Sequence, residues 1–531
     1  MFSRTVLVIV TFFFVAAAYA QKPVVEIGPE IKIDKDMNFW GHLHSDATGH
    51  YVMLVESGPS LGMAIALGGL APARSIKPIV QKYDRKYALV FSKEFKVDDN
   101  DVELGNMLYA GSKFYLCTQV KDKKAKKFTC SVTPVDLNGK AGKVQKVATI
   151  QYNEKDDAPS DVIWQMSEDT TKLLVATVAD DNNDNLKAKV SLNVYDNQLN
   201  KAWGKGFTLP YTQEQVTAQT WSLANDGQVY LLAKVYDGSR KKESKKTGDE
   251  RRPAYQMILF RFDGTSDKPK EFVLAFGEKF VTDLTFKLNH TNDLSCAGFY
   301  ANDTKGVIQG VFFLRLDGKT GAVVTASQKE LSAADIENLD TKKDRSGNEG
   351  LSSNYDFNKL ILREDGGVLV TAEKVYITFS SSSTGNRMSN TTIYHNDEVF
   401  VTSVAPDGKI EWVKVIPKKQ QGSVSMFNGY MTMVSGSNVY ILYNDDEDNI
   451  KLPLTAKAKG LSSFKDAAAA LVTISAEGKA SRRQIFDSKA DAEALMVPGD
   501  GEQISPNELL FVTTKFKLLG KTSLRLGLVR M

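Results

Sequence analysis

The sequence predicts an all-β protein whose strands form an eight-bladed β-propeller, a ring of four-stranded antiparallel sheets. Segments that alternate apolar and polar residues recur along the 531-residue chain and are separated by turn residues. These segments group in fours, with a period of roughly 50 to 75 residues. A lone segment near the start complements an incomplete group at the end. Together these observations favour a closed ring over a string of separate domains.

The clearest group contains two hairpins, whose turns are Asp365-Gly366-Gly367 and Pro406-Asp407-Gly408. Its four strands run through Leu360, Val370, Val401 and Trp412. Six further complete groups cover residues 38–95, 102–151, 162–210, 216–277, 281–330 and 424–488. These groups predict seven complete blades.

The two ends of the chain supply the eighth blade. Residues 495–531 contain three strands and lack a fourth, whereas residues 24–33 form one isolated alternating segment. Pairing the isolated segment with the last strand completes a sheet and hides an edge that would otherwise invite aggregation. A ring of seven blades, with one weak group as an insertion, is the alternative.

Propeller geometry assigns the connections to two faces, with strands lettered A to D outward from the centre. The A–B and C–D turns are short, whereas the B–C and D–A segments 57–75, 237–252, 329–354 and 378–396 are long, and we expect loops there. Binding residues usually lie on such loops of a rigid scaffold. We therefore expect the B–C/D–A face to bind a partner.

Two segments of that face are candidate binding residues. The first has four apolar side chains, Leu61, Met63, Ile65 and Leu67, which either cap the ring or dock a partner. The second is a basic run, Arg240, Lys241 and Lys242, which either is solvated or attracts anionic glycans or lipid headgroups.

The first twenty residues predict export. Arg4, an apolar stretch and Ala18-Tyr19-Ala20 match a signal peptide with its cleavage site. The mature chain, residues 21–531, is predicted to be a single propeller domain without a transmembrane span, in the periplasm or outside the cell. Its 67 basic and 64 acidic residues give a net charge of +3, which does not point to nucleic acid.

Cysteine spacing gives a disulfide hypothesis. A two-residue turn at Lys123-Lys124 would place Cys117 directly opposite Cys130 in a hairpin, near the separation that a disulfide requires. The alternative is two buried free thiols. Cys296 is predicted to be buried in a strand.

Metal ligands and catalytic motifs are sparse. His42 and His44 are two residues apart on a predicted strand, so both side chains would point to one side and could share a metal ion. Residues 180–185 and 444–449 are rich in Asp and Asn, which calcium prefers, but lack the pattern of an EF-hand. We expect no cofactor, with calcium or another divalent metal as the alternative.

The hairpin from Ala405 to Trp412 (APDGKIEW) resembles the repeats of quinoprotein-like propellers. In those repeats Asp-Gly-Lys closes the outer hairpin and Trp packs between blades. Residues 316–324 share the turn, and residues 196–203 share the tryptophan, Trp203. The resemblance implies the fold and not a quinone cofactor, and it is nearer to secreted propellers of unassigned function than to enzymes.

Two functions are expected from the sequence. The first is an exported, non-enzymatic scaffold that binds an envelope or extracellular protein or glycan through its B–C/D–A face. The alternative is a carbohydrate-active hydrolase or lyase that uses carboxylates at the mouth of the central channel.

Overall fold

The computed structural model describes most of the chain between residues 23 and 531. The described residues are 23–33, 37–56, 77–95, 102–151, 162–178, 185–238, 244–247, 250–274, 276–277, 279–302, 307–337, 339–344, 346–352, 354–384, 387–462, 466–486, 495–515 and 523–531. Within these ranges the chain forms β-strands and a few 3-10 turns but no α-helix. None of the described residues forms a helix long and apolar enough to cross a membrane.

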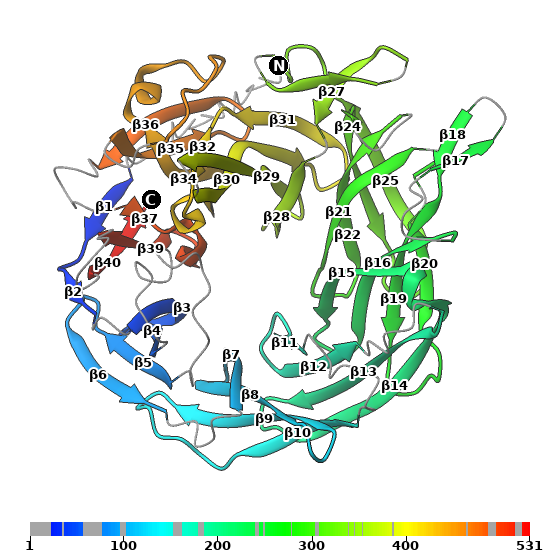
Figure 1. Ribbon diagram of the computed structural model, residues 1–531, viewed down its shortest axis with the longest axis vertical. Coiled ribbons are helices and arrows are strands. Elements are labelled where there is room, and N and C mark those ends of the chain that lie inside the picture. Colours follow the sequence, from blue (N-terminus) through cyan, green and yellow to red (C-terminus); the bar gives the residue numbers. More distant parts are fainter. Residues whose placement is uncertain are drawn as a thin grey trace, which may run out of the picture.

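The sheets are arranged in a ring around a central opening, which is the architecture of a β-propeller (Figure 1). Seven sheets follow one another along the sequence, and in each the strands are ordered from the inside of the ring outward. The first four are β3 (Met37–Asp46), β4 (Gly49–Glu56), β5 (Lys77–Tyr83), β6 (Leu89–Glu94); β7 (Val102–Ala110), β8 (Lys113–Asp122), β9 (Lys127–Asp136), β10 (Gln145–Gln151); β11 (Val162–Met166), β12 (Lys172–Val178), β13 (Lys187–Asp196), β14 (Lys201–Thr212); and β15 (Val216–Leu223), β16 (Val229–Tyr236), β19 (Tyr255–Phe262), β20 (Lys270–Leu274).

The next three are β21 (Phe280–Leu288), β22 (Leu294–Ala301), β24 (Gly310–Leu316), β25 (Val323–Glu330); β28 (Tyr355–Leu362), β29 (Val368–Thr384), β30 (Arg387–Val404), β31 (Ile410–Ile416); and β33 (Met431–Ser435), β34 (Asn438–Asp446), β35 (Ala467–Ile474), β36 (Ala480–Phe486). The short strand β32 (Gln420–Gly422) pairs with β30. The 3-10 turns are η1 (Gln213–Gln215), η2 (Ser425–Phe427), η3 (Glu447–Lys451) and η5 (Pro498–Asp500). These sheets match the seven groups predicted from the sequence.

The last sheet joins the two ends of the chain, as predicted. It contains β37 (Leu495–Met496), β38 (Glu502–Ser505), β39 (Glu508–Lys515), β40 (Ser523–Arg530), β1 (Val24–Ile27) and β2 (Ile31–Lys32). Strand β1 pairs antiparallel with β40, from Val24 opposite Arg530 to Ile27 opposite Gly527. Arg530 also forms ion pairs with Glu26 and Glu508, and Arg85 of the neighbouring sheet binds Glu508 at 2.8 Å. The N-terminal strand therefore holds the ring closed.

Apolar side chains pack between neighbouring sheets all around the ring. Residues of the closing sheet pack on one side against the β33–β36 sheet, with Phe511 against Met433, and on the other against the β3–β6 sheet, with Leu526 beside Leu54. Comparable clusters join each of the other successive pairs of sheets. The core is therefore divided among the interfaces between sheets, and each sheet depends on both neighbours.

Three segments predicted to be loops contain strands. Residues 378–396 extend β29 and β30 into a long hairpin that stays paired from Thr378 opposite Ile393 to Thr384 opposite Arg387. Residues 237–252 include part of the two-stranded sheet of β17 (Ser244–Thr247) and β18 (Glu250–Pro253), and residues 329–354 include β26 (Thr341–Lys343) and β27 (Glu349–Ser352), which pairs with β23 (Val307–Ile308). The loop prediction was wrong here because polar residues occur in exposed strands as well as in turns, and cross-strand pairing satisfies the backbone of a polar strand equally well.

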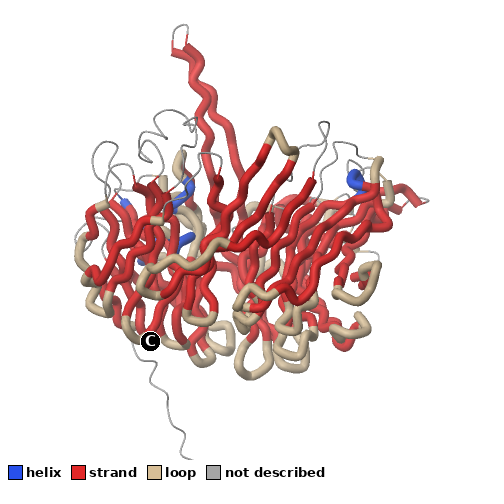
Figure 2. The backbone as a smooth tube through the Cα atoms, turned by 90° about the horizontal axis from the view of Figure 1, so that it is seen from below, coloured by secondary structure: helices blue, strands red, loops and turns tan. Residues whose placement is uncertain are grey.

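The β29–β30 hairpin projects from one side of the ring, and short turns lie on the opposite side (Figure 2). It is a B–C connection, so it belongs to the B–C/D–A face. The long extension distinguishes this face within the described part of the chain.

Candidate functional site

The candidate site lies at the base of the projecting hairpin, where its two strands leave the ring. A register shift occurs there: Glu373 pairs with Val399, but Val375 pairs with Asn396. The shift leaves Lys374 of β29 and Asp397 and Glu398 of β30 without register partners between these two strands. Such β-bulges re-aim side chains and are common beside functional sites.

Five charged side chains are buried at this base, each no more than 7% exposed. They are Glu373, Lys374, Asp397, Glu398 and Lys418. Buried charges are costly unless they are paired and hydrogen-bonded, so the partners of each group determine what the site can bind.

Lys418 is fully compensated. Its Nζ atom lies 2.7 Å from Glu373 Oε1 and donates hydrogen bonds to the backbone oxygen of Asn396 and to Gln420 Oε1, at 2.6 and 2.9 Å. The amide of Asn396 in turn donates to Glu373 Oε2 at 2.8 Å. The Lys418 ammonium therefore has one ion-pair contact and donates two hydrogen bonds.

Lys374 and Glu398 form a second, looser pair. The Lys374 ammonium lies 3.5 Å from Glu398 Oε1 and 3.0 Å from the exposed carboxylate of Asp340. Tyr355 donates to Glu398 Oε1 at 2.5 Å. Burial, and then the Glu398 carboxylate, raise the pKa of Tyr355 well above its usual value, so the hydroxyl remains a donor.

Asp397 is only partly satisfied. Tyr376 donates to Asp397 Oδ2 at 3.1 Å, but Oδ1 has no hydrogen-bond partner among the described residues. Burial, and then the neighbouring Glu398, raise the pKa of Asp397. Tyr376 is held in place by stacking on His395, with ring centroids 4.3 Å apart.

A cavity of about 290 Å³ opens beside these groups. Its wall includes Lys374, Tyr376, Asp397, Glu398 and Lys418 from the base of the hairpin and from the segment after β31. Leu339, Asp340, Pro417, Lys419, Lys457 and Ala458 complete the wall. The cavity is therefore polar and accommodates a small charged group.

The predicted apolar and basic binding residues lie outside the described residues. These are Leu61, Met63, Ile65, Leu67, Arg240, Lys241 and Lys242. The docking and basic-patch hypotheses for them stay predictions.

His42 and His44 lie on β3, on either side of a bulge. A bulge between them pairs His42 with Val52 and His44 with Tyr51, which breaks the simple two-residue alternation. His44 stacks on Tyr109, with ring centroids 3.6 Å apart. In the described part of the chain no three His, Cys, Asp or Glu side chains are grouped so that they could hold a metal ion.

His42 instead joins a hydrogen-bonded chain beside the central opening. Its Nδ1 lies 2.7 Å from Glu502, its Nε2 lies 2.8 Å from Ser45 Oγ, and Ser45 Oγ lies 2.7 Å from Nδ1 of His50. The Nε2 atom of His50 is buried and has no partner among the described residues. We therefore place the imidazole proton on Nδ1, because an orphaned N–H is costlier than an orphaned lone pair. The chain then runs from His50 through Ser45 and His42 to Glu502, and it ties β3 and β4 to β38.

The predicted register of the cysteine hairpin was wrong by two residues. The turn between β8 and β9 has four residues, so Cys117 faces Val132 and Cys130 faces Gln119. All three cysteines are free and buried, which is the alternative that the sequence left open. A diagonal pair of this kind is too far apart for a disulfide without backbone movement.

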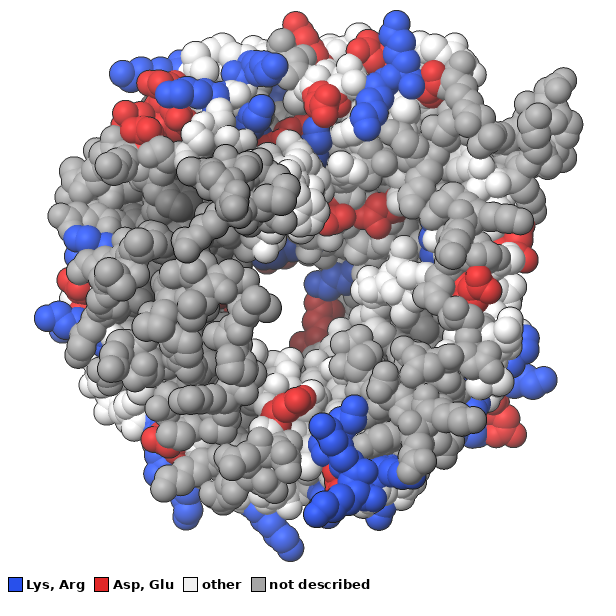
Figure 3. All heavy atoms as spheres, in the orientation of Figure 1, with Lys and Arg blue, Asp and Glu red and all other residues white. Residues whose placement is uncertain are grey.

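Charged side chains are visible on the wall of the central opening (Figure 3). Three further carboxyl groups have raised pKa values. Asp283 accepts hydrogen bonds from the backbone N–H groups of Leu284 and Phe357, and burial raises its pKa to about 6. Asp356, on the neighbouring inner strand, also has a raised pKa, through burial and then Glu373. Burial likewise raises the pKa of Asp500 to about 7.

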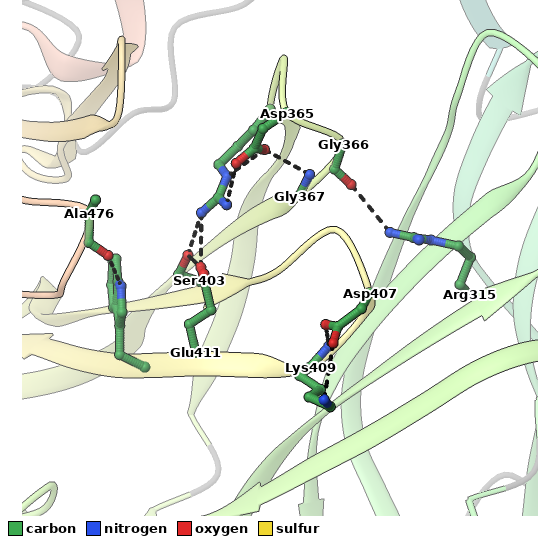
Figure 4. A network of polar contacts seen from close by, with 11 residues as sticks. Arg315, Asp365, Gly366, Gly367, Ser403, Asp407, Lys409, Glu411 and Ala476 are labelled. Atoms are coloured by element: carbon green, nitrogen blue, oxygen red, sulfur yellow. Dashed lines mark hydrogen bonds and ion pairs between the residues drawn. The ribbon is translucent and has the colours of Figure 1, made fainter. Parts of the chain in front are cut away.

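The hairpin that resembles quinoprotein-like repeats has a structural role. Its Gly408 adopts a φ of +87°, which suits the turn, and Trp412 Nε1 donates to the backbone oxygen of Ala476 in the next sheet at 2.7 Å. Trp203 makes the same kind of bond to Gly227. Figure 4 shows the turns around Asp365 and Asp407, with Arg315 of the preceding sheet reaching the backbone of Gly366. The expected packing of tryptophan between blades is confirmed for these two residues.

Sequence reasoning missed the charged residues of the hairpin base. The signal was present: Glu373-Lys374 and Asp397-Glu398 place consecutive charges inside strands that otherwise alternate apolar and polar residues. Consecutive charges break the period of two and indicate a bulge. Their closeness depends on strand pairing, which the mistaken loop assignment concealed.

No protein-family model matches this sequence, and no curated protein matches it. Among solved structures, the chain is similar to the WD40 domain of SCAP from fission yeast, with 9% identity, a TM-score of 0.40 and coverage of 96% of this chain and 98% of that chain. It is also similar to the β-propeller domain of the Trilobed protease from Pyrococcus furiosus (11% identity, TM-score 0.33, 85% and 97% covered). For prolyl oligopeptidase B from Galerina marginata the values are 7% identity, TM-score 0.37 and coverage of 90% and 55%. Likenesses of this size carry no argument about activity or partners.

Proposed function

We propose that the chain is an exported, eight-bladed β-propeller that acts as a scaffold and binds a protein or glycan partner through its B–C/D–A face. The observation that carries this proposal is the projecting β29–β30 hairpin. Its strands extend beyond the sheet to which they belong and carry exposed apolar side chains, with Phe379 78% and Ile377 51% exposed. Large exposed apolar groups on a projecting element are typical of contact surfaces.

The hairpin suits a binding role for a second reason. Within the described residues its outer part is paired only with itself, so both of its edges there present backbone groups that a partner strand can join. The signal-peptide pattern of residues 1–20, which lie outside the described residues, supports export. The eight sheets of four or more strands support the blade count.

A truncated hairpin tests the proposal. Replacing residues 378–393 by Asn-Gly would connect the paired residues Ile377 and Tyr394 through a tight turn and leave the ring intact. The wild-type chain, immobilised and exposed to native envelope extract, should retain a partner that the truncated chain does not, with the same melting temperature for both.

A point substitution sharpens this test. Phe379→Ser should weaken retention, whereas Val324→Ser, which changes an exposed apolar residue of β25 elsewhere on the ring, should not. Equal retention by the truncated chain and the wild type would exclude the hairpin as the binding element.

The hydrolase alternative is favoured by one observation, the neighbouring Asp283 and Asp356 on inner strands. A carboxyl with a pKa near 6 can serve as a general acid, and glycosidases use two carboxylates. Release of reducing ends from envelope polysaccharides, lost in Asp283→Asn and kept in the turn variant Asp407→Asn, would support this function. No release by the wild-type chain would count against it.

A further inference from the structure

The hydrogen-bonded chain beside the central opening has the connectivity of an activated serine. Glu502 Oε2 lies 2.7 Å from His42 Nδ1, and His42 Nε2 lies 2.8 Å from Ser45 Oγ. A carboxylate and a hydroxyl are thus joined through the two nitrogens of one imidazole. In this order the imidazole can take the hydroxyl proton while the carboxylate fixes its tautomer and orientation.

The bulge in β3 brings His42 and Ser45 together. Residues three apart on a regular strand point to opposite faces of the sheet, so the two side chains would not meet on an undistorted β3. The register shift between His42 and His44 adds one residue to this strand, and His42 and Ser45 come within hydrogen-bond distance. Bulges of this kind re-aim side chains beside active sites.

The protons of the chain are placed as a nucleophile requires. His50 Nδ1 lies 2.7 Å from Ser45 Oγ and donates to it, so the hydroxyl donates its own proton to His42 Nε2. His42 then carries its proton on Nδ1, which faces Glu502. The hydrogen bond from His42 is the main cause that lowers the pKa of Glu502, so this carboxylate is ionised at neutral pH.

The two ends of the series retain exposed surface, whereas its centre is shielded. Ser45 is partly buried and lies one residue before the β3–β4 turn, an A–B turn on the side of the ring opposite the projecting hairpin (Figure 2). The side chain of Glu502 is 60% exposed, and that of His42 is 4% exposed. Solvent water therefore has little access to the imidazole and does not displace its two hydrogen bonds.

Two other hydroxyl groups each lack one member of the series. Thr378 Oγ1 lies 2.8 Å from His395 Nε2, but His395 Nδ1 has no hydrogen-bond partner among the described residues. Ser475 Oγ donates to Glu477 Oε2 at 2.8 Å with no imidazole between them. Within the described ranges, the full series of carboxylate, imidazole and hydroxyl therefore occurs at Ser45 alone.

We propose that Ser45 is a nucleophile that cleaves carboxylic esters, with His42 as its general base and Glu502 as the residue that positions His42. Ser45 Oγ bonds to the carbonyl carbon of the ester while its proton passes to His42 Nε2, and the alcohol takes this proton as its C–O bond breaks. Water then gives a proton to His42 Nε2 and bonds to the acyl carbon. The bond to Ser45 Oγ breaks, the oxygen regains the proton, and the carboxylic acid is released. An ester is the substrate class that fits, because an alcohol leaves an acyl carbon more readily than an amine does.

This activity is independent of both functions proposed above. Its residues lie on β3 and β38 and not on the projecting hairpin, so the truncated hairpin variant should lose its macromolecular partner and still cleave esters. The nucleophile is a hydroxyl and the bond cleaved is an ester, which also separates the activity from a glycosidase that uses Asp283 and Asp356.

Covalent labelling of the purified chain tests the proposal. A fluorophosphonate reacts with a serine whose hydroxyl is activated by a base, and mass mapping locates the modified residue. The label should be found on Ser45 and not on Thr378 or Ser475. Hydrolysis of p-nitrophenyl acetate measures turnover, and Ser45→Ala should abolish both the label and the enzymatic release of p-nitrophenol.

Two variants test the partners of Ser45. His42→Gln should lower the labelling rate and kcat about a hundredfold or more, because it removes the base. Glu502→Gln should lower kcat about tenfold or more and leave KM and the melting temperature unchanged, since this exposed residue acts only through His42. Ser475→Ala changes a serine that is also partly buried and also bound to a carboxylate, and this matched control should keep the wild-type activity.

The proposal is overturned if the wild-type chain takes no fluorophosphonate at Ser45. It is also overturned if Ser45→Ala hydrolyses the ester as fast as the wild type does. A Glu502→Gln variant that keeps the wild-type kcat, or that loses activity only together with its melting temperature, would show that the series only ties β3 to β38.

Discussion

Lys418 and Glu373 form an ion pair whose side chains are 0% and 3% exposed. Removing one partner leaves the other charge buried, so Lys418→Met should lower the free energy of unfolding by about 3–5 kcal/mol in urea denaturation. The double variant Lys418→Met/Glu373→Gln should recover much of this loss. Lys409→Ala breaks the exposed pair with Asp407 and should cost less than about 1 kcal/mol. A small effect of Lys418→Met would contradict the assigned pairing.

His50 is buried, and burial, then Arg85, lowers its pKa to about 4. The unfolded chain binds a proton at this histidine near pH 6.5, whereas the folded chain does not. Stability from His50 is therefore present above pH 6.5 and is lost as the pH falls toward 4, by up to about 3 kcal/mol.

Urea denaturation at pH 7, 6 and 5 measures this dependence. His50→Gln removes the titrating group and should flatten the decline in stability below pH 6.5. A decline as steep in the variant as in the wild type would assign the acid sensitivity to other groups.

At the scale of single elements, the β8–β9 hairpin shows how one turn decides chemistry. Its four-residue turn displaces Cys117 from Cys130, and burial raises the pKa of Cys130 and of Cys296 to about 12. Iodoacetamide should therefore label none of the three thiols in the native chain and all three in denaturant without reductant. If mass mapping finds only one labelled cysteine in denaturant, the other two are joined, and the hypothesis of a Cys117–Cys130 disulfide would be correct.

The strands were predictable where apolar and polar residues alternate next to Gly-containing turns, as on either side of Asp365-Gly366-Gly367 and of Pro406-Asp407-Gly408. Residues 378–396 were misassigned because Ser, Thr and Asn are typical of both turns and exposed strands, and the pairing of β29 with β30 decides between them. The cavity beside the hairpin base could not be predicted, since it joins Asp397 of β30 to Lys457, a residue placed by packing and not by any period in the sequence.

At the scale of the whole molecule, ring closure depends on β1 and β2. Deleting residues 24–32 would remove the pairing with β40 and the partly buried Ile27 and Ile31, and should lower stability by about 3–6 kcal/mol. The exposed edge of β40 should also promote association in size-exclusion chromatography. Glu26→Gln, which breaks only an ion pair with Arg530, should elute as the wild type does and be nearly as stable. An unchanged melting temperature after the deletion would contradict this dependence.

Under the proposed export, the pairing of β1 with β40 also determines when this sheet can form as the chain crosses the membrane. Strand β1 emerges first and has no sheet partner until β40, which emerges last, has been exported. Contacts of such long sequence separation form late and slowly. We therefore expect proteases and holdase chaperones to compete for the partly exported chain, before β40 is available to pair with β1.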